Sequence, residues 1–454
     1  MTDYTFGFAR SGFARLGLGL VSAAAFLAAC AATPQEAGPV GTPPITPSDP
    51  DIEPQPTIPS MPPFTSSGNA SMDTWRDDFA SRAVASGRDA VVVYETLASI
   101  RPLDLYLSDE ASIAKTGVAD QAEFAKPIWD YVGSAVTSGR KTRGAEKLAT
   151  LAPTFDRIEA AYGVDREALT AIWAMETNLG SYIGSFDGPN TLANMAVEGR
   201  RKSFAERELT ALMKLQEQGE VSRDQLVSGW AGAMGQTQFM PSTFLAYAVD
   251  GDGDGRKDLW NSEADALMSA ANYLKVSGYQ NNMPWGIEVI APSDFDWAFA
   301  DGQDRRMSTW LSKGLSPTRG GGFGVDDGTF AELWLPSGAT GPKYLLFNNF
   351  DVFKTYNRSD SYAFSVGLLA DGVAGQTGPI TPWPTNLQLL SRRDIMVLQD
   401  NLNRLGFDAG PVDGIAGRGT KGALRRFQSA NGITPADGFP TQQALSQVIA
   451  AASG

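Results

Sequence analysis

The chain has 454 residues, of which 43% are hydrophobic and 19% charged, a composition typical of a globular protein with two or more domains. It contains no histidine, which excludes a Ser-His-Asp or Cys-His nucleophile, a His-ligated zinc and an imidazole base. Acid/base chemistry is left to carboxylates, Tyr or Lys. The net charge of −14 argues against nucleic acid and against broad adhesion to anionic lipid, and favours a neutral or basic ligand.

The N-terminal segment has the features of a bacterial export signal. Arg10 and Arg15 precede an apolar run over residues 16–29, which is too short to span a bilayer. The run ends in Leu-Ala-Ala-Cys30, which resembles a lipobox and implies cleavage before Cys30 and lipidation of its sulfur. Ala31 stands where an Asp would favour inner-membrane retention, so an outer-membrane lipoprotein is expected. The alternative is an ordinary export signal with an incidental cysteine.

A tether follows the predicted signal peptide of residues 1–29. Residues 30–70 are rich in Pro, Thr, Ser, Asp and Gly and carry few apolar side chains. Such a composition cannot bury a core, so we expect an extended segment that lets an anchored protein act away from its membrane. Because Cys30 is the only cysteine of the chain, no intrachain disulfide is expected.

The globular part begins near Ser71 and is mainly α in its first half. Helical spacing of apolar residues is seen around residues 75–94, 128–132 and 155–162. A further helix pattern, over residues 165–183, contains the most informative side chain of the sequence.

Glu176 falls on the apolar stripe of this helix pattern. Asp165 offers an N-cap, and Leu169 to Ile183 carry apolar residues at helical spacing, with Glu176 where another apolar residue is expected. Burial disfavours the charged form, so we expect a raised pKa for Glu176. A carboxyl group that stays protonated near neutral pH is what protonation of a glycosidic oxygen requires. The alternative is that Glu176 pairs with an Arg or Lys inside the core, or reaches water.

The segment over residues 228–244 is rich in glycine and small residues. It allows close backbone approach, Gln238 can donate and accept hydrogen bonds, and Pro241 is suited to the first position of a new helix. Such a loop suits an acetamido sugar, and it equally suits tight packing between helices.

The segment over residues 250–261 matches a calcium-binding EF-hand loop at its first, third, fifth, sixth and ninth positions. Asn261 replaces the bidentate Glu of the twelfth position, which lowers the expected affinity. A bound Ca²⁺ would brace the loop and take no part in catalysis; a metal-free Asp/Gly turn is the alternative. The residues predicted as ligands here are Asp250, Asp252, Asp254 and Asp258.

The pattern changes from about residue 285 to residue 353. Short alternating runs with a Gly-rich break predict a small antiparallel sheet inserted into the α domain; they cover residues 287–290, 333–335 and 344–347. Residues 356–369 return to a helical pattern.

Three of these motifs together resemble the membrane-bound lytic murein transglycosylase B family. They are Met-Glu176-Thr-Asn-Leu-Gly, the run Trp-Ala-Gly-Ala-Met-Gly-Gln-Thr-Gln-Phe-Met-Pro, and Tyr356-Asn-Arg-Ser-Asp-Ser-Tyr362-Ala. The resemblance implies a mainly α, lysozyme-like catalytic domain over residues 71–370, with helical and small β additions around a saccharide groove.

The resemblance also assigns roles to individual residues. It makes Glu176 the catalytic acid/base and adds Asp265 as a late ligand of the metal loop. The family usually has Gly-Ser-Trp, whereas this chain has Ser228-Gly-Trp230, so Ser228 is carried over from a neighbouring position. The other residues expected to line the groove are Tyr131, Gln238, Tyr273, Tyr356, Asn357 and Tyr362.

The implied reaction needs only one carboxylate. The 2-acetamido group of N-acetylmuramic acid attacks its own anomeric carbon, and a 1,6-anhydro ring closes without water or a catalytic cofactor. A hydrolytic muramidase with a second carboxylate such as Asp187 is one alternative, and a non-catalytic lipoprotein that tethers peptidoglycan is another.

The C-terminal part predicts a separate module. A linker rich in Gly, Pro and Thr covers residues 371–390, and three short amphipathic helix patterns follow over residues 391–450. Leu-Gly-Phe-Asp-Ala-Gly-Pro-Val-Asp-Gly-Ile, over residues 405–415, resembles the three-helix peptidoglycan-binding domain. Peptidoglycan glycan strands are therefore the expected partner, with membrane contact through the lipid anchor alone.

Overall fold

The structure is a computed structural model that describes residues 61–103, 127–199 and 201–453. The predicted signal peptide, the lipidation site Cys30 and the tether as far as residue 60 lie outside the described residues. Among the helices that are described, none has the length and apolarity needed to cross a bilayer.

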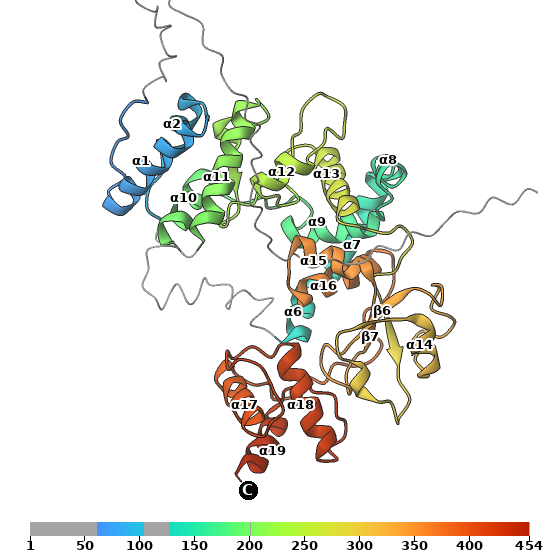
Figure 1. Ribbon diagram of the computed structural model, residues 1–454. Helices are drawn as coiled ribbons and strands as arrows, with labels where there is room; N and C mark the ends of the chain where they lie inside the picture. Colours follow the sequence, from blue (N-terminus) through green and yellow to red (C-terminus); the bar gives the residue numbers. More distant parts are fainter. Residues whose placement is uncertain (1–60, 104–126, 200, 454) are drawn as a thin grey trace, which may run out of the picture. The chain divides into compact units, whose positions relative to one another are not determined.

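The described chain is mainly helical with small antiparallel sheets, which confirms the predicted fold class (Figure 1). The helices before the C-terminal module are α1 (Ala70–Ala85), α2 (Ala90–Leu97), α6 (Ile128–Ala135), α7 (Ser138–Thr150), α8 (Ala152–Tyr162), α9 (Arg166–Thr177), α10 (Gly188–Glu198), α11 (Lys202–Glu217), α12 (Pro241–Tyr247), α13 (Glu263–Val276), α14 (Met307–Ser312), α15 (Asn348–Tyr356) and α16 (Asp360–Val373).

These helices enclose two hydrophobic cores. The first core is centred on α9, whose Trp173 is fully buried, and includes the facing residues of α13 and α16. The second core joins α1, α2, α10 and α11 with α12. Helix α12 starts at Pro241, as predicted. The fixed φ of proline suits the first helical position, where a backbone N–H would have no partner within the helix.

Helix α9 is shorter than the apolar spacing predicted. It ends at Thr177, because Asn178 and Leu179 adopt left-handed backbone conformations with φ of 54° and 64°. Asp165 occupies the N-cap position without capping through its side chain, and instead accepts a 2.8 Å hydrogen bond from the hydroxyl of Tyr279. The part of the stripe from Leu179 to Ile183 therefore lies in a loop.

The predicted inserted sheet is present and has five strands in the order β4-β6-β7-β3-β5, all neighbours antiparallel. Sequence patterning predicted β3, β6 and β7 and missed two very short strands, β4 and β5. The strands are β3 (Gly286–Ile290), β4 (Asp304–Arg306), β5 (Ser316–Pro317), β6 (Phe330–Trp334) and β7 (Tyr344–Leu346). A separate two-stranded pair joins β1 (Phe186–Asp187) to β2 (Val227–Ser228).

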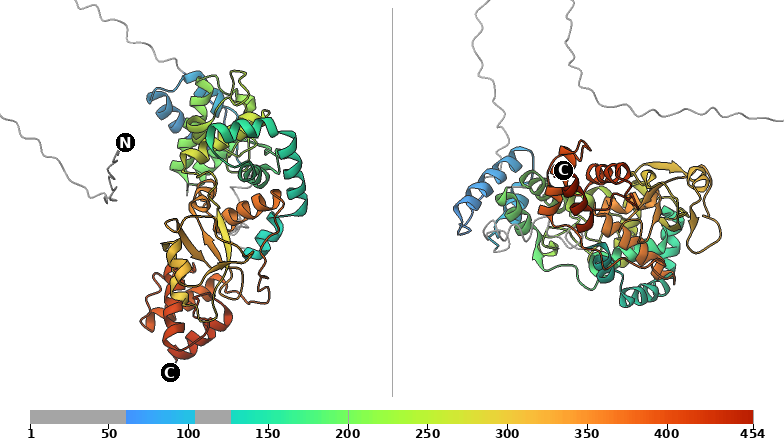
Figure 2. Two further views of the ribbon diagram at one scale, coloured as in Figure 1. Left: turned by 90° about the vertical axis from the view of Figure 1, so that its right-hand side faces the viewer. Right: turned by 90° about the horizontal axis from the view of Figure 1, so that it is seen from below.

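The C-terminal module has its own core. Helices α17 (Arg392–Arg404), α18 (Arg418–Ala430) and α19 (Gln442–Ala452) bury Leu398, Leu424 and other apolar residues among themselves (red in Figures 1 and 2). Gln399, 1% exposed, donates to Asp413 and accepts from the backbone of Gly414, so it fixes the glycine-containing turn between α17 and α18.

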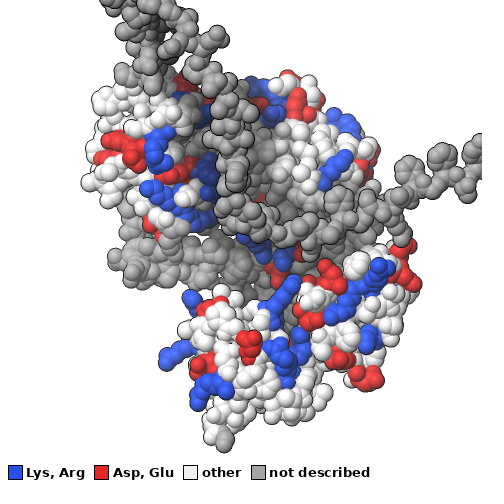
Figure 3. All heavy atoms as spheres, viewed as in Figure 1, with Lys and Arg blue, Asp and Glu red and all other residues white. Residues whose placement is uncertain are grey.

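Charged side chains of both signs alternate over the described face in Figure 3.

Candidate active site

Glu176 lies in the last turn of α9 and is half-buried. Its Oε1 accepts a hydrogen bond from the hydroxyl of Tyr362, which comes from α16 and is 4% exposed. The end of α9 is held in place by Thr177, whose Oγ1 donates to the carbonyl of Gln236 at 2.6 Å. The carboxyl group is therefore fixed both by its own helix and by a helix far along the chain.

Buried Tyr362 and half-buried Tyr356 lie near the carboxyl group. Burial, with the nearby charge of Glu176 as a second cause, raises the pKa of Tyr356 and of Tyr362 well above the ordinary value. Both phenols are thus neutral hydrogen-bond donors at physiological pH. The hydroxyl of Tyr356 is buried and has no hydrogen-bond partner among the described residues, so it is available to a group that enters next to Glu176.

Tyr273 belongs to an aromatic cluster behind these tyrosines. Its ring centroid lies 5.3 Å from that of Tyr356 and 5.9 Å from that of Phe239, both in edge-on contact. Its hydroxyl donates to the carbonyl of Thr355 at 2.9 Å. Tyr273 therefore orients Tyr356, and only part of its ring remains exposed.

Tyr131 and Asn357 are the remaining residues of the predicted set. Tyr131, on α6, is 9% exposed and lies near Tyr362, to whose raised pKa it is the smallest contributor, after burial, Glu176 and Tyr356. Asn357 lies in the break between α15 and α16, where its Oδ1 accepts from the backbone N–H of Ser359 at 3.0 Å.

The structure does not place Ser228 at an open surface. Ser228 is fully buried in β2, and its hydroxyl donates to the carbonyl of Gly229 at 2.9 Å. Its burial leaves the assignment of Ser228 as a groove residue a prediction. Gln238 is half-buried, and its Nε2 donates to the carbonyl of Gly235 at 2.9 Å.

Asp187, the candidate second carboxylate, is engaged elsewhere. Its two oxygens accept from the two terminal nitrogens of Arg223 at 2.6 and 2.8 Å. A bidentate pair of this kind holds a carboxylate in one orientation. Asp187 is therefore poorly suited to attack a sugar or to activate water.

The predicted metal loop gathers three of its five carboxylates. Asp250, Asp252 and Asp254 are exposed and offer oxygen atoms within 4.8 Å of one another, a spacing that fits one cation. The structure does not bring the other two into this group. Asp258 accepts from the backbone of Trp260 and Asn261, and Asp265, 1% exposed, accepts from the backbone N–H groups of Gly251, Asp252 and Asp258.

Sequence reasoning gave no role to several residues that shape the site. Thr177 anchors the end of α9, and Phe239 supports Tyr273. Arg140 donates to the carbonyl of Ala135 and also contacts the sulfur of Met175, the residue before Glu176. Burial lowers the pKa of the Arg140 guanidinium. Phe239 lies within one of the three motifs of the family resemblance, whereas no sequence pattern indicates a role for Arg140.

The fold and the site together define the class of the protein: a lysozyme-like helical domain whose candidate acid/base is a carboxyl group held by tyrosine. Comparison with known proteins then gives the family. Residues 71–371 match the transglycosylase SLT domain, and residues 391–447 match a putative peptidoglycan-binding domain. The chain belongs to the family of the transglycosylase SLT domain, as the motifs around Glu176 predicted.

Individual relatives agree with this assignment. The chain is 30% identical over 234 residues to membrane-bound lytic murein transglycosylase B of Escherichia coli K12, across 48% of this chain and 60% of that protein. It thus matches about three fifths of the length of this relative. SltB3 from Pseudomonas aeruginosa, solved in complex with NAG-anhNAM-pentapeptide, shares 39% identity with a TM-score of 0.77, over 84% of this chain and all of that one. Escherichia coli Slt35, solved with calcium, shares 26% identity with a TM-score of 0.56, over 71% and 98% of the two chains.

Proposed function

We propose that the protein is a lytic transglycosylase that cleaves the β-1,4 bond between N-acetylmuramic acid and N-acetylglucosamine in peptidoglycan. The observation that carries this proposal is the hydrogen bond from buried Tyr362 to Glu176, with Tyr356 beside it. The family membership and the ligand-bound SltB3 relative support the same reaction.

In the proposed reaction, Glu176 acts first as acid and then as base. Its proton goes to the glycosidic oxygen as the C1–O bond of the muramoyl residue breaks. The 2-acetamido oxygen of the same sugar bonds to C1. The carboxylate of Glu176 then takes the proton of the 6-hydroxyl, whose oxygen displaces the acetamido oxygen from C1. The products are a free 4-hydroxyl and a 1,6-anhydro end, and no water is consumed.

The tyrosines serve both states of Glu176. The hydroxyl of Tyr362 stabilises the carboxylate that is left after the first proton transfer, since hydrogen bonds to charged groups are the stronger ones. Tyr356, with its free buried hydroxyl, is placed to donate to a sugar oxygen next to Glu176.

The hydrolytic alternative has less support. A muramidase that uses two carboxylates would need Asp187 to be free, whereas Arg223 binds it through both oxygens. A non-catalytic tethering lipoprotein would not need a carboxyl group held by a buried tyrosine.

We further propose that the C-terminal module binds peptidoglycan and that the protein acts in the cell envelope. The match of residues 391–447 and the membrane-bound relative support this location. Lipidation of Cys30 and attachment to the outer membrane rest on the lipobox alone. A Ca²⁺ ion held by Asp250, Asp252 and Asp254 is proposed as a structural brace, supported by their spacing and by the calcium-bound Slt35 relative.

The test is digestion of purified sacculi by the wild type and by Glu176→Gln, with mass spectrometry of the products. We expect muropeptides that are one water lighter than hydrolytic products from the wild type, and none from the variant. Products with reducing muramoyl ends, which contain the added water, would identify a muramidase instead. Digestion that persists in Glu176→Gln would remove Glu176 from the mechanism.

A further inference from the structure

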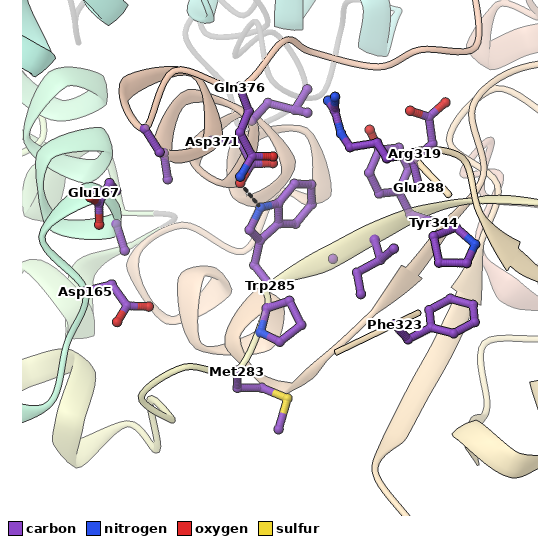
Figure 4. A pocket seen from close by; sticks show the side chains of 18 of the residues that line it. Asp165, Glu167, Met283, Trp285, Glu288, Arg319, Phe323, Tyr344, Asp371 and Gln376 are labelled. Carbon is purple, nitrogen blue, oxygen red and sulfur yellow. Dashed lines mark hydrogen bonds between the residues drawn. The ribbon is translucent and has the colours of Figure 1, made fainter. Parts of the chain in front are cut away.

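A cavity of about 510 Å³ is lined by residues of the inserted sheet and of the first core, and Glu176 is not among its lining residues (Figure 4). None of the tyrosines of the candidate active site lines it. Its volume falls in the range of small-molecule sites. Trp285 and Tyr344 form an aromatic wall, with ring centroids 5.5 Å apart and nearly parallel planes. Phe323 and Met283 extend the apolar lining.

Four carboxyl groups line this cavity, and the structure distinguishes between them. Glu288 accepts from the backbone N–H groups of residues 380 and 381 at 2.7 and 2.8 Å, and Asp165 accepts from Tyr279 at 2.8 Å. Glu167 lies with Asp165 on the wall opposite Asp371 in Figure 4. Asp371 lies at the end of α16, on another element of the cavity wall.

Asp371 accepts one long hydrogen bond, from the indole N–H of Trp285 at 3.3 Å. Burial raises the pKa of Asp371 to about 6, against the opposing effects of Trp285 and of the nearby Arg319. A carboxylate has about four acceptor sites, so most of the capacity of Asp371 is unused. A ligand that brings N–H donors can therefore form further hydrogen bonds with Asp371.

Arg319 supplies the one positive charge among the residues that line the cavity. Its guanidinium donates to the carbonyl and the hydroxyl of Thr377, which fixes its position near Asp371. Since a guanidinium has five N–H groups, further donors remain for a ligand. The cavity therefore presents an acceptor and a donor of opposite charge beside an aromatic wall.

We propose that this cavity binds the head group of an α-amino acid, with its ammonium on Asp371 and its carboxylate on Arg319. The aliphatic stem of the ligand would pack on Trp285 and Tyr344. If the proposed function holds, the natural source is the free end of a diamino acid in the peptide stems of peptidoglycan. Acylation of that amine by a cross-link removes its charge and two of its three N–H donors. The site would therefore distinguish uncross-linked from cross-linked stems.

The test is titration calorimetry of the full chain with the tripeptide L-alanyl-γ-D-glutamyl-meso-diaminopimelate and with the same tripeptide acetylated on its distal amine. The probe contains no glycosidic bond, so binding is measured independently of cleavage. We expect acetylation, and separately Asp371→Asn, to weaken binding at least ~10-fold, the loss of one charge-assisted hydrogen bond. Glu176→Gln, in the other site, and Asp294→Asn, an exposed carboxyl outside the cavity, should keep wild-type affinity.

Equal affinity for the two tripeptides would overturn the proposal, as would absence of binding to the wild type. Because the acetylated probe is tested on the wild type, the proposal stays open to refutation even if Asp371→Asn does not fold. Loss of tripeptide affinity in Glu176→Gln would assign the binding to the active site and also refute the proposal. If sacculi are not cleaved but the tripeptides are still distinguished, the proposed function fails and the amino-acid site stands.

Discussion

Asp371→Asn should make the protein more stable at neutral pH. Burial raises the pKa of Asp371 from 3.8 to about 6, so the folded state binds a proton more tightly than the unfolded state. The stability that this proton contributes is fully present below pH 4 and is lost as the pH rises through about 6. The asparagine can still accept from Trp285 but carries no charge, so the variant avoids this loss.

The size of the effect follows from the shift. A pKa difference of about 2.2, from 3.8 to about 6, corresponds to about 3 kcal/mol at 1.36 kcal/mol for each unit. Water that reaches the half-buried carboxyl group reduces this, so we expect ~1–3 kcal/mol in the free energy of unfolding at pH 7.5. In a domain of this size, each kcal/mol moves the melting temperature by roughly 2–4 °C.

Scanning calorimetry of the wild type and Asp371→Asn at pH 4 and pH 7.5 measures this directly. Other titrating groups are common to both proteins and cancel in the difference between them. Asp294→Asn is the matched control, because it removes an exposed carboxyl group and should show no pH-dependent difference. A difference that is the same at both pH values, or that favours the wild type more at pH 7.5, would refute the reasoning.

Three further changes test the site, the metal loop and the packing. Tyr362→Phe removes the hydroxyl that donates to Glu176, worth ~1.5–3 kcal/mol, so initial rates on sacculi should fall roughly 10- to 100-fold; a change within about twofold would contradict this role. Ca²⁺ at about 100 times its Kd should stabilise the wild type by ~2.7 kcal/mol but not Asp252→Asn, as read from melting temperatures; equal shifts would show that the loop does not hold the ion. Gly367→Ala would place a Cβ 2.3 Å from the ring of Trp285 and should cost about 1–3 kcal/mol in urea unfolding, whereas an unchanged midpoint would mean that the indole moves freely.

Local pattern was enough to predict much of this fold. The apolar spacing before Glu176 predicted α9, and alternating runs predicted β3, β6 and β7. A helix or strand that buries one face repeats its apolar residues at the period of that element, so these elements can be recognised in the sequence. The end of α9 was missed because an apolar residue, Leu179, adopts a left-handed conformation that propensity disfavours.

The candidate site was less accessible to local reasoning. The contact between Glu176 and Tyr362 joins residues 186 positions apart, and only the family resemblance brought both into one set. Ser228 is buried and pairs with β1, a contact between distant parts of the chain that its motif does not reveal. Spacing likewise could not show that backbone N–H groups occupy Asp265, since that depends on how the loop closes onto α13.

The long separation between Glu176 and Tyr362 also has a consequence for biosynthesis. Helix α9 can form as soon as its residues emerge, but its carboxyl group acquires the tyrosine hydroxyl only when α16 docks against it. A chain that is still being made therefore carries an incomplete centre until almost the whole domain has been synthesised. The order in which the helices form would therefore keep the enzyme inactive until α16 has docked.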